Sequence, residues 1–177
     1  MGWFSPVKGS YPSLAQVDKT LPVDDSASTL VRGMIVTMAT DTNSKPVWKI
    51  ADGTKDTYYV ALQDYVDPTA GFAGTSFTPN PTADHPARPA VTAIDLAQDG
   101  EYETSVFEGN PQVGEKLYVS NGKLTTSGSG THVGIVTQSA ASRWINNAIA
   151  VPETGTDPRL AVRTGAREKV IRFKTAL

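Results

Sequence analysis

The chain has 177 residues, a formal net charge of -2 and no cysteine. This length supports one domain with a sizeable core, the small charge gives no global field for nucleic acid or an acidic membrane, and the missing thiols exclude disulfides and thiolate sites. Val, Ile and Thr supply 45 residues against 9 Leu, and because β-branched side chains favour strands, we expect a mainly β fold.

Residues 1–28 contain three prolines and no sustained helical or strand period, which predicts an extended N-terminal arm. Trp3 and Phe4 lie in this segment, and aromatic side chains are costly to leave in water. We expect them to dock, either on the chain's own core or on a partner. The segment lacks the apolar run of a secretory leader, and no apolar stretch reaches the length of a membrane span, so no membrane partner is expected.

The first strands are predicted at residues 30–38, 45–51 and 57–64, from their β-branched and aromatic content. Asp52-Gly53, between the second and third of these, is a turn signal within a loop longer than two residues. The pattern predicts a meander.

A long surface loop is predicted at residues 67–89, which contain five prolines. No strand period survives that many missing amide donors. Loops of this length in compact domains are usually functional or disordered, and Phe72 and Phe77 favour an ordered loop that makes contacts.

Strands at 90–98 and 102–108 flank Asp99-Gly100, and this combination predicts a hairpin. A second hairpin is predicted from strands at 115–120 and 123–126. They flank Asn121-Gly122, a dipeptide that tolerates positive φ at both central positions of a two-residue turn.

A further strand is predicted at 131–138, whereas residues 142–150 satisfy both helical and strand spacing, so their state stays open. At the C-terminal end, the strand period of residues 169–174 places Ile171 and Phe173 on one face and Val170, Arg172 and Lys174 on the other. This alternation predicts a C-terminal edge strand, able to close the chain's own sheet or to pair with a neighbour.

The C-terminal end is also basic. Residues 159–177 hold six Lys or Arg against one Glu, which gives about +5 from six minus one. Such a run is either a solvated tail or an arm that lies on an acidic neighbour. The candidate contacts of the whole chain with a partner or with other subunits are therefore Trp3, Phe4, Phe72, Phe77, Arg163, Arg167 and Arg172.

Residue types that carry catalysis are scattered along the chain. His85 and His132 lie in different segments without metal-ligand spacing. Residues 109–114 have the glycine spacing of a phosphate-binding loop, but Glu115 stands where that loop has its Lys, and a strand is expected to follow. We therefore expect no catalytic site, metal or cofactor. A single aromatic beside the basic set gives no nucleic-acid pattern either.

One series of turn and strand signals is distinctive: Gly-x-x-Leu-Tyr-Val, a turn, Gly-x-Leu-Thr and then Val-Gly, preceded by a core-strand glycine and by the strand YYVALQD. The residues that carry it are Gly33, Gly114, Leu117, Tyr118, Val119, Gly122, Leu124, Thr125, Val133 and Gly134. This series, within residues 30–66 and 100–140, resembles the decoration or cement proteins of tailed-bacteriophage capsids.

The resemblance implies a small β-barrel or β-sandwich core on the outside of the phage capsid. The protein would stabilise the expanded shell by bridging subunits of the major capsid protein, with further contacts to its own copies or to neighbouring decoration subunits. It would be made in the bacterial cytoplasm and carried on the capsid exterior of the virion. The resemblance implies no catalysis.

The predicted organisation is an N-terminal arm at 1–28, a β core at 29–150 that carries the proline-rich loop, and a basic C-terminal arm or edge strand at 151–177. Two other functions stay open. The first is a tail-tube or baseplate subunit, since these are also β-rich with inter-subunit arms.

The second alternative is a carbohydrate- or receptor-binding module, with Trp3, Trp48 and Trp144 as stacking faces. Trp48, beside Val47 and Ile50, is equally well interpreted as a core aromatic.

Overall fold

A computed structural model of the chain describes its fold. It describes residues 4–8, 19–24, 26–27, 29–66, 90–97, 100–144 and 167–175. Within these ranges every regular element is a strand and none is a helix, so the expectation of a mainly β fold is confirmed. In chain order the strands are β1 (Phe4–Lys8), β2 (Lys19–Pro22), β3 (Thr29–Leu30), β4 (Ile35–Thr40), β5 (Pro46–Ile50), β6 (Tyr59–Ala61), β7 (Tyr65–Val66), β8 (Ala90–Asp95), β9 (Glu101–Thr104), β10 (Lys116–Ser120), β11 (Lys123–Thr125), β12 (Gly134–Trp144) and β13 (Arg167–Thr175).

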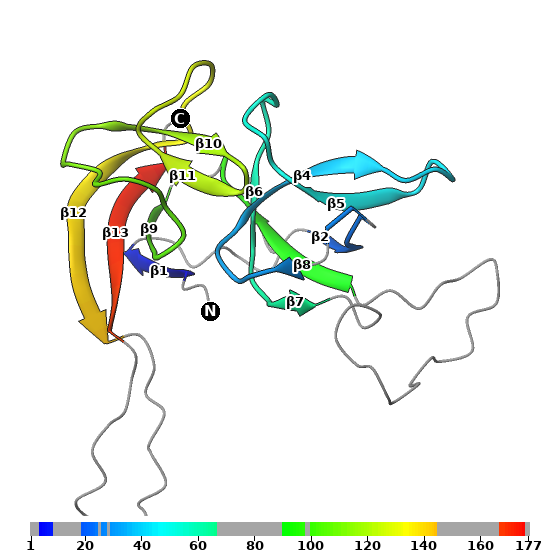
Figure 1. Ribbon diagram of the computed structural model, residues 1–177, viewed down its shortest axis with the longest axis horizontal. Helices are drawn as coiled ribbons and strands as arrows, with labels where there is room; N and C mark the ends of the chain where they lie inside the picture. Colours follow the sequence, from blue (N-terminus) through cyan, green and yellow to red (C-terminus); the bar gives the residue numbers. More distant parts are fainter. Residues whose placement is uncertain are drawn as a thin grey trace, which may run out of the picture.

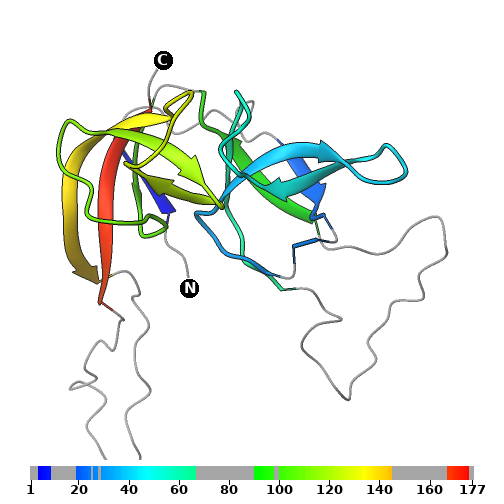
Figure 2. The same ribbon diagram turned by 45° about the horizontal axis from the view of Figure 1, so that its top comes forward.

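Two antiparallel sheets lie side by side (Figures 1 and 2). The first sheet has the strand order β1-β9-β13-β12-β10, and β11 extends it through its hairpin with β10. The second sheet has the order β2-β8-β6-β4-β5. A short pair, β3 with β7, completes the described strands.

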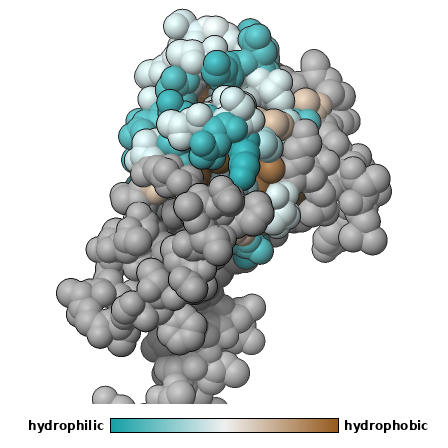
Figure 3. Space-filling view, turned by 90° about the vertical axis from the view of Figure 1, so that its right-hand side faces the viewer, coloured by the Kyte–Doolittle hydropathy of each residue, from teal (hydrophilic) through white to brown (hydrophobic). Residues whose placement is uncertain are grey.

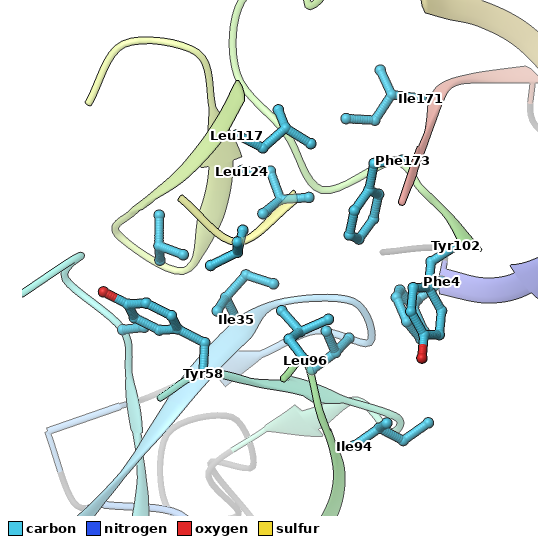
Figure 4. Packing of buried hydrophobic residues seen from close by; sticks show 14 of the residues in the cluster. Phe4, Ile35, Tyr58, Ile94, Leu96, Tyr102, Leu117, Leu124, Ile171 and Phe173 are labelled. Atoms are coloured by element: carbon cyan, nitrogen blue, oxygen red, sulfur yellow. The ribbon is translucent and has the colours of Figure 1, made fainter. Parts of the chain in front are cut away.

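The largest apolar cluster lies between the two sheets and takes side chains from both (Figure 4). Its bulkiest members are Phe4, Ile35, Tyr58, Ile94, Leu96, Tyr102, Leu117, Leu124, Ile171 and Phe173. Strands of the second sheet are apolar on both faces, since Ile35 belongs to this cluster and the next residue, Val36, to another. Successive strand side chains point to opposite faces, so the second sheet must cover an additional core.

This second core is centred on Trp48, which is fully buried and donates a hydrogen bond from its ring nitrogen to the Val91 carbonyl over 2.8 Å. The two edges of the second sheet meet beside it. Val23, directly after β2, forms a parallel bridge to Trp48 on β5, and the Asp24 amide donates to the Trp48 carbonyl over 2.8 Å. Val23 and Asp24 thus join the two edges of the second sheet at Trp48, beside the second cluster.

The Asn121-Gly122 hairpin is confirmed, with φ of 46° and 74° at its two turn residues. Its turn also joins the sheets. The Gly122 amide donates to the Ala51 carbonyl over 2.7 Å, and the Ile35 amide donates to the Gly122 carbonyl over 2.8 Å. The tip of the first sheet's hairpin is therefore hydrogen-bonded between β4 and the end of β5.

The predicted meander of residues 30–64 is wrong in its strand order, because β4 lies between β5 and β6. The Asp52-Gly53 loop consequently passes from one side of β4 to the other. Gly53, at φ +95°, packs so closely on β10 that a Cβ atom there would lie 2.2 Å from the Val119 carbonyl oxygen. Contact with the other sheet, and not hairpin closure, explains the glycine.

The hairpin predicted around Asp99-Gly100 is also wrong. β8 belongs to the second sheet, whereas β9 belongs to the first, between β1 and β13. The chain crosses between the sheets at Leu96, which is buried and donates its amide to the Tyr58 carbonyl over 2.9 Å. Pairing with two distant strands outweighs the local turn signal.

The C-terminal strand prediction is right about the faces of the strand and wrong about its place. Ile171 and Phe173 are buried, as expected. However, β13 lies inside the first sheet, hydrogen-bonded to β9 on one side and β12 on the other, and is no edge strand or arm. Its partner β12 extends to Trp144, so residues 142–144 are strand, and residues 145–150 lie outside the described ranges.

The described parts of the predicted N-terminal arm are likewise integral to the sheets. β1 pairs with β9 in the first sheet, and β2 pairs with β8 in the second. Val23 and Ala27, which follow β2, are both buried in the second core. A free arm would leave these apolar side chains in water, whereas here they complete the second core.

Candidate binding surfaces

Three of the seven predicted contact residues fall in the described ranges: Phe4 on β1, and Arg167 and Arg172 on β13. The remaining four, Trp3, Phe72, Phe77 and Arg163, lie outside these ranges. The predicted loop at 67–89 also lies outside them. Phe4, Arg167 and Arg172 all belong to the first sheet. The side chains of Phe4 and Arg172 lie on opposite faces of this sheet, and Arg167 is placed only as the first residue of β13.

Phe4 belongs to the inner face, with only 1% of its surface exposed. Its ring stacks on Tyr102 with 5.1 Å between centroids and an interplanar angle of 21°. The Arg32 guanidinium donates to the Phe4 carbonyl over 2.9 Å. Of the two docking places expected for Phe4, the structure shows the chain's own core (Figure 4).

Arg172 lies on the outer face, the side of the first sheet that is turned away from the apolar cluster between the sheets. There it forms an ion pair with Glu103. Its Nη2 and Nε donate to the same carboxylate oxygen over 2.7 and 3.2 Å. The Glu103 side chain is only 12% exposed and that of Arg172 is 27% exposed. Because a carboxylate this buried requires a charge partner, Arg172 acts as the counter-ion of Glu103 within the fold.

The cross-strand row two residues along from this pair lies on the same face. This row contains Lys116 on β10, Ile135 on β12, Lys174 on β13 and Glu101 on β9. Paired residues of adjacent strands point to the same side. Ile135, with 40% of its surface exposed, thus lies between two exposed lysines.

A second exposed apolar residue lies beside β12. Val113, 64% exposed, donates its amide to the Ser139 hydroxyl over 3.2 Å. Its neighbour Gly114 donates to the Val136 carbonyl over 2.9 Å, which holds the loop against the strand. Among the described residues, Val113 and Ile135 are the exposed large hydrophobic side chains, and both border β12. The loop continues into β10 and not into a helix, so the geometry of a phosphate-binding loop is absent from this described stretch.

Sequence reasoning missed the outer face, although a signal for it exists. Glu101-x-Glu103 and Arg172-x-Lys174 have strand spacing and opposite charge, and the structure pairs Arg172 with Glu103 and Lys174 with Glu101 in register. Opposite charges across an antiparallel pair are favourable. The spacing indicates which side chains share a face, but the sequence separation of 69 between Glu103 and Arg172 conceals the pairing.

A second surface is a shallow polar depression of about 470 Å³ between the loops 52–56 and 127–131. Asp52 lies on its rim and accepts hydrogen bonds from the Thr54 hydroxyl over 2.7 Å and the Thr54 amide over 3.0 Å. These bonds lower the pKa of the Asp52 carboxyl below its ordinary value. The described surface on the second sheet's side is mostly hydrophilic (Figure 3).

Trp48, offered by the sequence as a carbohydrate-stacking face, is 0% exposed and tilts against the Tyr59 ring at 4.9 Å between centroids. Its interpretation as a core aromatic is confirmed. Trp3 lies outside the described residues, and Trp144 is placed only as the last residue of β12. A stacking platform at Trp48 is therefore excluded.

Within the described ranges, no three His, Cys, Asp or Glu side chains come together in a way that could hold a metal ion. The same part of the chain contains no helix with the length and apolar character needed to cross a membrane. Comparison of the chain with protein-family models, curated proteins and solved structures found no match.

Proposed function

We propose that this chain is a structural virion protein that binds the exterior of a tailed-phage capsid, bridges major capsid protein subunits and stabilises the expanded shell. The observation that carries the proposal is the resemblance of residues 30–66 and 100–140 to capsid decoration proteins. These two segments are distant in sequence, yet Ile35 and Tyr58 from one share a core with Leu117 and Leu124 from the other. The resembling residues thus belong to one packed unit.

The second sheet, which holds strands of residues 30–66, is proposed to form a small β-barrel, whereas the strands of residues 100–140 belong to the first sheet packed against it. Supporting this, Val23 bridges to Trp48 so that the two edges of the sheet meet, and an apolar cluster lies beside them. Closure of a sheet removes the open edges through which sheets aggregate. Slow hydrogen exchange at the Asp24 amide, which donates to the Trp48 carbonyl, is the expected signature of that closure.

The capsid-binding surface is proposed to be the outer face of the first sheet. Ile135 and Val113 supply exposed apolar area there, and Lys116 and Lys174 flank Ile135. Interfaces place apolar groups at the centre and charged groups at the rim. A capsid surface with an apolar spot and nearby carboxylates would complement this arrangement.

The physical effect on the shell is linkage. A ligand that binds only the assembled, expanded lattice stabilises that state by RT ln(1 + [L]/Kd) at each site. Because the lattice presents many equivalent sites, a modest affinity per subunit adds up to a large stabilisation of the shell.

The test mixes the purified protein with expanded, undecorated capsids and measures co-sedimentation and the melting temperature of the capsid. We expect both binding and a rise in melting temperature. If the protein does not co-sediment with the capsids and their melting temperature does not rise, the proposal is refuted. An antibody label on phage particles places the protein on the head or on the tail, and labelling of the tail would favour a tail-tube or baseplate subunit.

Ile135→Glu tests the proposed surface. We expect it to weaken capsid binding on the order of ten-fold or more, as substitution of a central interface residue does. Thr40→Glu is the matched control, because Thr40 is exposed at the end of β4 in the second sheet and the substitution changes the charge equally. Equal binding by both variants would show that the outer face does not contact the shell.

A further inference from the structure

The first sheet begins with an unusual edge strand. β1 has one neighbour among the described strands, β9, and pairs with it antiparallel from Phe4 opposite Thr104 to Lys8 opposite Glu101. The register shifts between Pro6 and Lys8. Proline donates no ladder hydrogen bond and a bulge disrupts the ladder, so β1 is held by fewer backbone bonds than an interior strand.

A single deep anchor offsets this weak pairing. The Phe4 ring is 1% exposed and stacks on Tyr102, which itself lies 5.8 Å from the Phe173 ring, between centroids. The Arg32 guanidinium donates to the Phe4 carbonyl. The rest of the chain therefore forms a slot for one strand, consisting of the β9 edge, an aromatic pocket and an arginine donor.

We propose that this slot also accepts β1 from a second copy of the chain, so that copies exchange their N-terminal strands. Every copy carries the one sequence shown to fit the slot, and an exchanged strand makes the same contacts as the chain's own strand. β1 contributes its backbone pairing to β9 alone among the described strands, so its departure leaves the other described pairs intact. The inference is independent of capsid binding.

The population of the exchanged form depends on protein concentration, because each chain's own β1 is covalently attached to the chain that forms its slot. A chain's own β1 competes at the effective concentration of a short linker, in the millimolar range. The exchanged form is therefore a minor species in dilute solution and increases as the protein is concentrated. Wherever copies are held close together, exchange links them without any new interface.

Cross-linking between two full-length single-cysteine variants tests the proposal. The chain has no cysteine of its own. Lys8→Cys marks the donor strand and Glu101→Cys marks the slot, because Lys8 and Glu101 are register partners. Cross-strand partners lie within the Cα separation that a disulfide spans. We expect concentrated mixtures to form a disulfide heterodimer under oxidising conditions.

Phe4→Ala should change the heterodimer yield in opposite directions, depending on whether the donor or the acceptor chain carries it. In the donor chain it is expected to lower the heterodimer yield, because the acceptor's intact β1 then fills the slot better. In the acceptor chain it is expected to raise the yield, because the acceptor's own strand is weakened; each change should be on the order of ten-fold. If Phe4→Ala fails to fold, Phe4→Leu gives the same two signs. Yield changes of the same sign would overturn the proposal.

Two controls complete the design. A mixture of Lys8→Cys with Asn43→Cys, whose cysteine lies in an exposed turn far from β9 in the chain's topology, measures random collision. A heterodimer yield no higher than this control would overturn strand exchange. The double variant Lys8→Cys with Glu101→Cys must close a disulfide within one chain, and its failure to do so would overturn the register on which the slot depends.

Discussion

Phe4→Ala distinguishes an N-terminal arm from a core strand. The substitution removes a fully buried ring from the cluster between the sheets. Truncation of a buried Phe to Ala costs about 3–5 kcal/mol, and the lost stacking on Tyr102 is part of that cost. Since β1 is an edge strand, the loss is bounded by the free energy of docking β1, because beyond that the strand detaches. We therefore expect a loss of about 3 kcal/mol in the free energy of unfolding.

Urea denaturation followed by circular dichroism measures this loss. With a slope of about 1–3 kcal/mol per molar urea, the midpoint should fall by roughly 1–3 M. Val113→Ala is the matched control, since Val113 is 64% exposed and its truncation should cost less than about 0.5 kcal/mol. If Phe4→Ala were as mild as this control, β1 would not be part of the core, and the reasoning from burial would fail.

Two further substitutions test the joint between the sheets and the ion pair on the outer face. Gly122→Ala should destabilise the fold by roughly 1–3 kcal/mol in thermal unfolding, because its Cβ would lie 2.8 Å from the side chains of Ile50 and Met34. Gly109→Ala, at a φ of +77° close to the +74° of Gly122 but with open space around it, isolates the backbone strain and should cost less. Glu103→Ala should cost about 1–3 kcal/mol by leaving a half-buried guanidinium without its carboxylate. In a double-mutant cycle with Arg172→Ala, an interaction energy near zero would contradict the role assigned to the pair.

Turn signals in the sequence predict strand pairing correctly where the two paired strands are consecutive in the chain. Asn121-Gly122 predicts its hairpin because both turn residues need positive φ and the two strands it joins are partners. Asp99-Gly100 looks equally good, yet the strands around it belong to different sheets. A turn dipeptide shows where the chain can reverse, whereas strand pairing depends on which distant edge offers the better partner.

The outer face of the first sheet also shows that a pattern within one strand does not identify the strand's neighbours. Alternation correctly separates Ile171 and Phe173 from Arg172 on β13. However, no periodicity within one strand reveals that β13 is interior, because its neighbours β9 and β12 are assigned by pairing across the sheet. The basic residues therefore looked like those of a solvated arm. In the structure, the side chain of Arg172 neutralises a buried carboxylate.

The position of both terminal strands changes how truncation experiments must be interpreted. β1 and β13 flank β9 in the same sheet, so the first sheet joins residues near position 4 with residues near position 173. Such pairings of high sequence separation form late and cooperatively. Deleting residues 1–20 would remove the Phe4 anchor and would also expose Tyr102 and the β9 edge. Loss of capsid binding after that deletion would therefore not show that the N-terminal segment touches the shell, and a substitution of one exposed side chain, such as Ile135→Glu, is needed to separate a contact from its support.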